Sequence, residues 1–191
     1  AIARLLGDGE PEVRGAAVEA LERLGSADAV LAIVGVLQDS DRDVVIAGLE
    51  ALGALGQPSS VYAIIEKVHD RNADVAIAAI EALVELRAPE AIPALIELAQ
   101  IGRPEVALTA IEALGVFRSD ESVEVLVSEV VSPHIDGGRN AAISALESIA
   151  APSTGRPPMP PVRRRLSLEG LRGAAGLPQI RSTRRRHVRH E

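Results

Sequence analysis

The sequence predicts an all-α fold, an α-solenoid of stacked antiparallel helical hairpins. One nine-residue pattern recurs at a step of 31 residues, beginning at Val13, Val44, Val75 and Val106, and a weaker fifth copy begins at Gly138. Apolar or small residues within each copy follow the i, i+3, i+4 spacing of a buried helix face. A fixed period of this length is typical of repeat arrays, because one unit cannot bury its apolar side alone.

The first helix of each unit begins close to the recurring pattern. We number every copy from its first residue, so that Val13, Val44, Val75, Val106 and Gly138 stand at position 0. In the first copy, apolar or small residues lie at positions 0, +3, +4, +7, +8 and +11. Pro11 suits the first turn of this helix and Gly25 suits its end.

A second helix is expected in each unit after a short polar turn. The four predicted ranges are Asp28–Gln38, Ser59–His69, Glu90–Gln100 and Glu121–Val131. Ser59 and Ser60 are candidate N-caps of the second range, because their hydroxyls can accept from free helix amides. The array covers residues 1–150, with about five units. Residues 1–8 align with the second half of a second helix, so we expect a fragment of a longer array.

Two stretches point to a known family. The segment from Glu10-Pro-Glu-Val-Arg14 to Leu24-Gly25, and the segment Ala91-Ile-Pro-Ala-Leu95, resemble HEAT repeats of the short class first noted in phycobilisome lyases. The resemblance implies helical pairs and is nearly silent on function, since such arrays serve many unrelated tasks. It also implies an alternative function, a phycobilin lyase-type protein that attaches or releases a bilin, for which Tyr62 and Phe117 are the aromatic residues available.

Composition excludes several classes of protein. The chain has 191 residues and no cysteine, which rules out disulfides and thiolate metal sites. It has no run of about 18 apolar residues, the length needed to cross a membrane. We expect a cytoplasmic protein. Short HEAT arrays of this kind recur in bacterial proteins, so we also expect a bacterial source.

Charge divides the chain into parts of opposite sign. Residues 1–150 carry 10 Lys and Arg against 25 Asp and Glu, a net charge of −15, whereas residues 151–191 carry 10 Arg against two Glu, a net charge of +8. We expect a Pro-rich linker over 151–162 and a disordered Arg-rich tail over 163–191. The tail has three open interpretations: it binds nucleic acid, it folds back on the acidic array, or it has no selected function.

Position +6 of the first helices carries a ladder of acids, Glu19, Glu50, Glu81 and Glu112. Stacked units place these carboxylates one above another, where they either attract a basic partner or serve only as solvated surface residues.

Positions +1 and +2 depart from the Arg or polar residues usual in the resembled family. The three middle units carry Val45 and Ile46, Ala76 and Ile77, and Ala107 and Leu108. On a helical wheel, position +2 lies beside position +6, so Ile46, Ile77 and Leu108 form an exposed apolar strip on the concave wall if the groove is open. The alternative is that neighbouring repeats bury them.

We therefore predict a non-catalytic scaffold that holds a basic or amphipathic segment of a protein partner. The predicted partner-binding residues are Val45, Ile46, Glu50, Ile77, Glu81, Leu108 and Glu112. We expect no catalytic residues, no cofactor and no metal. The His-Glu pairs on which the HEAT-repeat metalloenzyme deoxyhypusine hydroxylase depends have one sequence counterpart here, His190-Glu191 at the chain end.

Overall fold

The computed structural model describes residues 2–151, and within them the backbone is helical, with no strand. The predicted linker and tail, 151–162 and 163–191, lie outside the described residues apart from Ala151. The elements in chain order are η1 (Ile2–Gly7), α1 (Pro11–Leu24), α2 (Ala27–Val36), α3 (Arg42–Leu55), η2 (Pro58–Ser60), α4 (Val61–Ile65), η3 (Glu66–His69), α5 (Ala73–Glu85), η4 (Pro89–Ala91), α6 (Ile92–Ile101), α7 (Pro104–Phe117), α8 (Asp120–Val131) and α9 (Gly138–Ala150). This is the predicted all-α solenoid.

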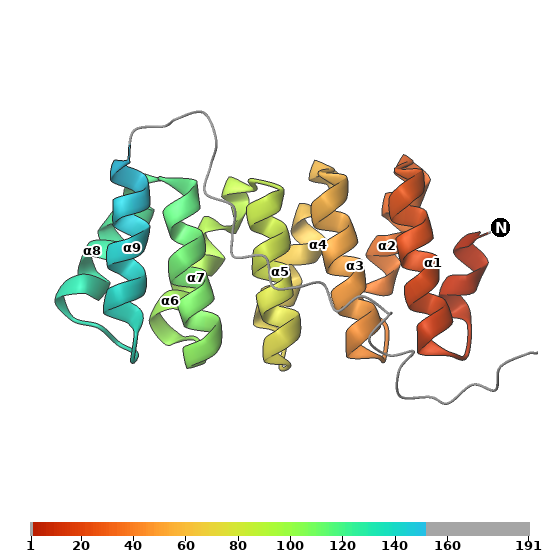
Figure 1. The fold of residues 1–191 in the computed structure, drawn as a ribbon, viewed down its shortest axis with the longest axis horizontal. Helices are drawn as coiled ribbons and strands as arrows, with labels where there is room; N and C mark the ends of the chain where they lie inside the picture. The colour runs from red at the N-terminus through yellow and green to blue at the C-terminus, as the bar shows by residue number, and fades with distance from the viewer. Residues whose placement is uncertain (1, 152–191) are drawn as a thin grey trace, which may run out of the picture. The chain divides into compact units, whose positions relative to one another are not determined.

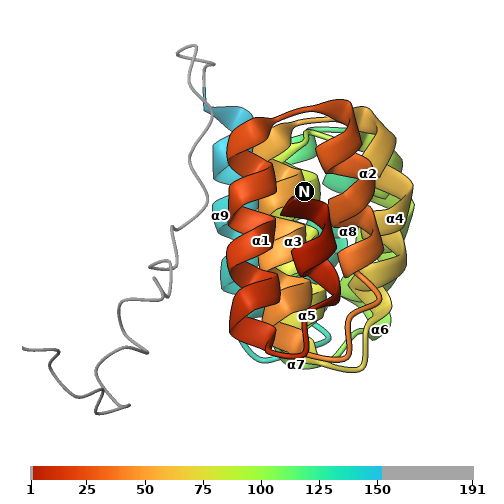
Figure 2. The same ribbon diagram turned by 90° about the vertical axis from the view of Figure 1, so that its right-hand side faces the viewer.

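Two layers of helices make up the stack (Figure 1). Helices α1, α3, α5, α7 and α9 each pack against the next one in that series, and we call them the odd layer. Helices α2, α4, α6 and α8 form the even layer on the other side, as the end view in Figure 2 shows. The recurring nine-residue pattern falls entirely in the odd layer, so equivalent positions line up from helix to helix.

The helix ends follow from local chemistry. Pro11 occupies the first turn of α1, where its missing N–H costs nothing, and Gly25 ends the helix at φ 60°, a left-handed conformation that glycine adopts without strain. The side chain of Asp41 caps α3 by accepting from the amides of Asp43 and Val44, and Asn72 caps α5 in the same way.

Ser60 stands at the predicted N-cap position of α4, but its side chain makes no capping hydrogen bond. Ser60 is buried, and its hydroxyl donates to the carbonyl of Gln57 at 2.8 Å instead of accepting from a helix amide. The reason is Pro58, which opens a 3-10 turn ahead of α4 and places Ser60 at the end of that turn. Two other serines do cap helices, because Ser26 and Ser119 accept from the amides of Ala29 and Ser122 at the starts of α2 and α8.

The core lies between the two layers and is aliphatic. The largest fully buried side chains are Val18, Ile33, Leu37, Leu49, Leu52, Ile64, Ile80, Leu83, Leu95, Ile111, Leu114 and Leu126. Small residues let neighbouring odd-layer helices approach closely. A Cβ on Gly53 of α3 would lie 3.1 Å from the Cα of Ala82 in α5, and one on Gly115 of α7 would lie 3.0 Å from the Cα of Ala145 in α9. This close spacing determines what the odd layer exposes.

Candidate binding face

Acids stand at two positions of each of the first four odd-layer helices. One precedes position 0 directly and the other lies at position +6, seven residues later. Seven residues turn an α-helix by almost two full turns, so both acids leave the helix in nearly the same direction. We call these eight residues the acidic face: Glu12, Asp43, Asp74, Glu105, Glu19, Glu50, Glu81 and Glu112.

The acidic face lies at the surface and ends at α7. Seven of its residues are exposed, and Glu81 is half-buried. The equivalent positions of α9 hold Gly137 and Ser144, so the last odd-layer helix adds no charge to the face. The acids before position 0 were missed in the sequence, although the same 31-residue period marks them.

The predicted exposed apolar strip is not present. Val45 is only 5 % exposed and Ile77 only 7 %, while Ile46 and Leu108 are half-buried. The close approach of neighbouring odd-layer helices explains the difference, because α5 is enclosed by α3 on one side and α7 on the other. Leu108 also packs against the loop that precedes α9, where a Cβ on Gly137 would lie 3.5 Å from its Cδ2 atom. Whether these four residues contact a partner stays a prediction.

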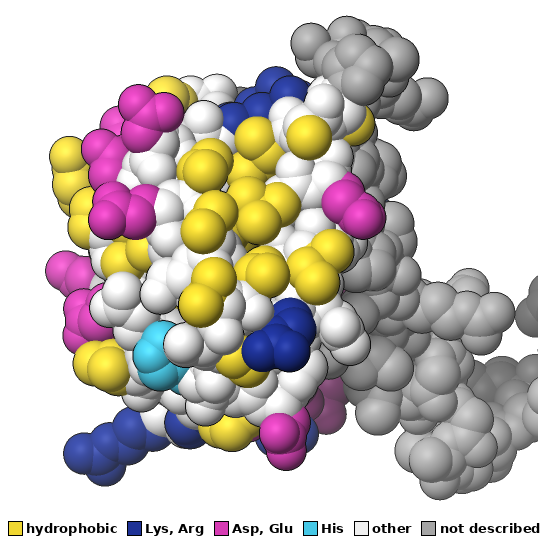
Figure 3. All heavy atoms as spheres, turned by 90° about the vertical axis from the view of Figure 1, so that its left-hand side faces the viewer, with side chains coloured by type: hydrophobic (Ala, Val, Ile, Leu, Met, Phe, Trp, Pro, Cys, Tyr) yellow, Lys and Arg dark blue, Asp and Glu magenta, His cyan; other side chains and the backbone are white. Residues whose placement is uncertain are grey.

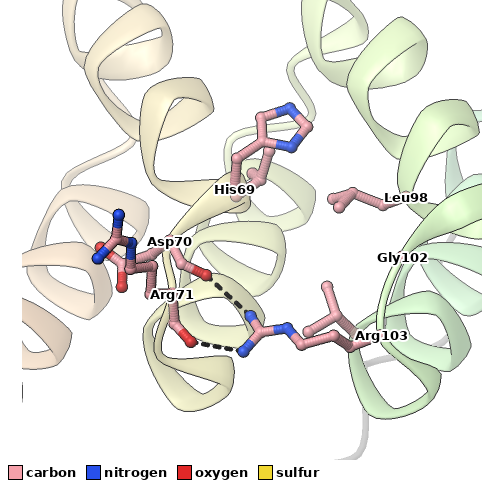
Figure 4. Close-up of a pocket in the computed structure, with 8 residues that line it drawn as sticks. His69, Asp70, Arg71, Leu98, Gly102 and Arg103 are labelled. Atoms are coloured by element: carbon pink, nitrogen blue, oxygen red, sulfur yellow. Dashed lines mark hydrogen bonds between the residues drawn. The ribbon is translucent and has the colours of Figure 1, made fainter.

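Two hollows are lined by residues outside the acidic face. The first, of about 380 Å³, is lined by Val68, His69, Asp70, Arg71, Leu98, Gly102, Arg103 and Val106. Figure 4 shows the guanidinium of Arg103 reaching across it to the backbone, where it donates to the carbonyls of Arg71 and Asp70 at 2.6 and 2.8 Å.

The second hollow, of about 390 Å³, is lined by Leu6, Gly7, Ala32, Gly35, Val36, Gln38 and Asp39. Leu6 and Val36 occupy the same repeat positions as Val68 and Leu98 of the first hollow, 62 residues earlier. A hollow that recurs at equivalent places is a consequence of how the even-layer helix ends stack.

One buried carboxylate was missed in the sequence. Glu129 of α8 is 3 % exposed and accepts from the backbone amide of His134 at 2.9 Å, and its other oxygen lies 2.7 Å from His134 Nδ1. A Cβ on Gly138 would collide with this carboxylate, so glycine is required there. The pair therefore fastens the loop between α8 and α9. Among residues 2–151, no three or more His, Asp or Glu side chains are grouped so as to hold a metal ion.

Two acids with shifted pKa values lie outside the acidic face. A side-chain hydrogen bond from Arg14 holds the pKa of Asp39 below its ordinary value and raises the pKa of Arg14. A backbone amide at the start of α8, together with the Ser119 hydroxyl, lowers the pKa of Glu121. These two carboxylates serve the fold, as a loop tie and at a helix start.

Within the described part of the chain, no helix is both long and apolar enough to cross a membrane.

Comparison with known proteins identifies the repeats. The model of the HEAT repeats matches residues 1–67 and 61–147. The structure of the complex of CpcE and CpcF of phycocyanin lyase from Nostoc sp. PCC7120 matches with a TM-score of 0.63 and 24% identity, over 82% of this chain. The chain spans 65% of the length of that protein.

Human deoxyhypusine hydroxylase, in complex with glycerol, is a more distant structural match, with a TM-score of 0.38 and 16% identity over 76% of this chain and 82% of that one. No curated protein matches the sequence. Because the family model matches residues 1–147 of the 191, this chain belongs to the HEAT-repeat family.

Proposed function

We propose that this protein is a non-catalytic scaffold of the cytoplasm, and that the acidic face binds a basic or amphipathic segment of a partner protein. The observation that carries the proposal is the double line of carboxylates across α1, α3, α5 and α7. Their negative potential attracts cationic partners and raises the association rate.

The spacing of the acids defines the partner further. Neighbouring packed helices lie about 8–10 Å apart, so carboxylates of successive repeats recur at about that interval. A helical partner rises about 10 Å in seven residues, and an extended one does so in about three. A segment with Lys or Arg at every seventh residue of a helix therefore meets one carboxylate of each repeat.

Apolar contacts contribute less than the sequence predicted. Because Val45 and Ile77 are buried, only the half-buried Ile46 and Leu108 offer aliphatic surface between the acids. Binding is then mainly electrostatic, and exposed ion pairs are screened over about 8 Å at physiological ionic strength.

A labelled helical peptide with four arginines spaced by seven residues tests the proposal, and fluorescence anisotropy with the full chain measures its affinity. We expect the triple variant Glu19→Gln, Glu105→Gln, Glu112→Gln to weaken binding about tenfold at low salt, because three ion pairs are lost. A peptide of the same composition with scrambled arginines is expected to bind more weakly than the regularly spaced one.

The matched control removes the same charge from the even layer. The variant Glu66→Gln, Glu97→Gln, Glu124→Gln changes three exposed acids of η3, α6 and α8. Its affinity is expected to stay within about twofold of the unsubstituted protein, because a uniform loss of net charge acts only over the Debye length. Equal losses in both variants would contradict a binding role for the odd layer.

A second candidate function is that of a phycobilin lyase-type protein. The fold match to the CpcE and CpcF complex favours it. Tyr62 is an exposed aromatic residue on α4 and Phe117 a half-buried one at the end of α7. Incubation of the protein with a bilin and an apo-phycobiliprotein, followed by visible absorption, separates the two functions. Attachment or release of the pigment would favour the lyase, and an unchanged spectrum would favour the scaffold.

A further inference from the structure

The α8/α9 end of the stack presents an apolar surface. Figure 3 looks onto this end and shows hydrophobic side chains gathered at its centre, with charged side chains toward the edges. Val127 and Val131 of α8 are 47 % and 72 % exposed, Ile143 of α9 is 39 % exposed, and Leu146 is half-buried. We call these four residues the end face.

The repeat positions of the end face show why it is unusual. Position +5 is fully enclosed in the first four odd-layer helices, where Val18 is 1 % exposed and Leu49, Ile80 and Ile111 are 0 % exposed. Each of these side chains is covered by packing within the stack. Ile143 holds the same position in α9, where no further odd-layer helix follows among the described residues. The end face therefore has the chemistry of an internal helix contact, without a covering helix in residues 2–151.

Charges on α9 are arranged symmetrically about Ile143. Arg139 lies four residues before it and Glu147 four residues after it, and both are exposed. Residues at i, i+4 and i+8 follow one side of a helix, so the two charges lie about 6 Å along the axis on either side of the isoleucine. The Nε atom of Arg139 donates to the carbonyl of Val130 at 2.9 Å, which holds one side of the guanidinium against α8.

We propose that two copies of this chain associate through their end faces about a two-fold axis that passes beside Ile143. The two α9 helices then run antiparallel, and Arg139 of each copy faces Glu147 of the partner subunit. A two-fold interface requires a surface that is complementary to itself. Arg139, Ile143 and Glu147 meet this condition when the two antiparallel α9 helices are aligned at Ile143. The apolar end face becomes covered in the same step.

The dimer is independent of the proposed function. Neither acid position of the acidic face is charged in α9, so the two surfaces do not overlap. Loss of peptide binding and loss of dimerisation are therefore separate outcomes, and failure of one leaves the other intact.

Sedimentation velocity of the full chain, over concentrations from about 1 to 200 µM, tests the interface, because interfaces of modest size commonly dissociate in the micromolar range. We expect a concentration-dependent monomer–dimer equilibrium for the unsubstituted protein and a monomer throughout for Ile143→Glu. The control Leu31→Glu introduces the same charge at another exposed aliphatic residue, which is 68 % exposed on α2, and it is expected to leave the equilibrium unchanged. Circular dichroism confirms that each variant is folded.

Charge reversal tests the register. Arg139→Glu and Glu147→Arg, each alone, place like charges opposite one another and are expected to weaken the dimer about tenfold or more. The double variant restores opposite charges and is expected to return to within about threefold of the unsubstituted dimer. A monomeric unsubstituted protein, an unaffected Ile143→Glu variant, or a double variant as weak as the single ones would overturn the proposed interface.

Discussion

Arg14 joins the first two hairpins through the most extensive polar contact in the described residues of the first repeat. Its Nε and one terminal nitrogen each donate to a carboxylate oxygen of Asp39 at 2.7 Å, and its other terminal nitrogen donates to the carbonyls of Asp8 and Gly9. A planar guanidinium suits this two-pronged contact, whereas a lysine would supply one point charge. The turn before α1 is thereby tied to the turn before α3.

Ile77, near the start of α5, belongs instead to the hydrophobic core. At 7 % exposure it belongs to the core, so Ile77→Glu is expected to destabilise the fold by about 3 kcal/mol, because a carboxylate would be buried without a partner. Urea denaturation followed by circular dichroism measures the loss. Leu31→Glu, at an exposed position of α2, is the control and is expected to change stability by less than about 0.5 kcal/mol.

Should Ile77→Glu unfold at the same urea concentration as the unsubstituted protein, position +2 is a surface position and the buried arrangement described above is wrong.

The sequence predicted the acidic ladder but left the burial beside it undecided, and the reason is physical. The direction of a side chain follows from its position in its own helix, so Glu50, Glu81 and Glu112 could be placed on one face from spacing alone. The exposure of Ile77 depends instead on how closely α3 and α7 approach α5. That distance is determined by small residues in other repeats, such as Gly53, and a helical wheel of a single repeat does not contain it.

At the scale of the elements, glycine and alanine contacts between odd-layer helices hold the stack together. Gly115 is the clearest case, since a Cβ there would lie 2.7 Å from the Cβ of Ala145 in α9. Gly15 of α1 differs, because a Cβ added to it would meet nothing within 4 Å. These two helical glycines permit opposite predictions for the same substitution.

Gly115→Ala is expected to destabilise the protein by about 1–3 kcal/mol, because α7 and α9 must move apart to admit the methyl group. Gly15→Ala is expected to stabilise it by about 0.5–1 kcal/mol, because the added Cβ restricts the unfolded chain and meets no atom in the folded one. Thermal or urea unfolding of the two variants measures both effects. Changes of the same sign at both positions would contradict the close α7–α9 contact.

The limits of helices were largely predictable, and the exceptions have local causes. Pro11 and Gly25 correctly indicated the bounds of α1. The 3-10 turns η2 and η4 were not anticipated, because a proline near a helix start is equally compatible with an α-helical and a 3-10 first turn. The end of α7 at Arg118, which is left-handed at φ 53° without being glycine, likewise carried no signal in the sequence.

At the scale of the whole molecule, the 31-residue period aligns acids of separate helices into one surface. Each of α1, α3, α5 and α7 supplies two carboxylates, and stacking aligns them across four repeats. The same stacking leaves the end face of α8 and α9 apolar, since each hairpin is built to be covered by another. One architecture thus provides two different surfaces, a charged one along the stack and an apolar one at its end.

The most direct measurement of the central claim, that the odd layer binds basic segments, is site-specific photo-crosslinking to the regularly spaced arginine peptide. A photo-reactive residue replaces the exposed Ala54 of α3, one turn beyond Glu50, or in a second protein the exposed Leu31 of α2, and every acid is retained. We expect a crosslink from position 54 that high salt abolishes, and little or none from position 31. Equal crosslinking from both positions, or crosslinking from position 31 alone, would show that the odd layer is not where basic segments bind.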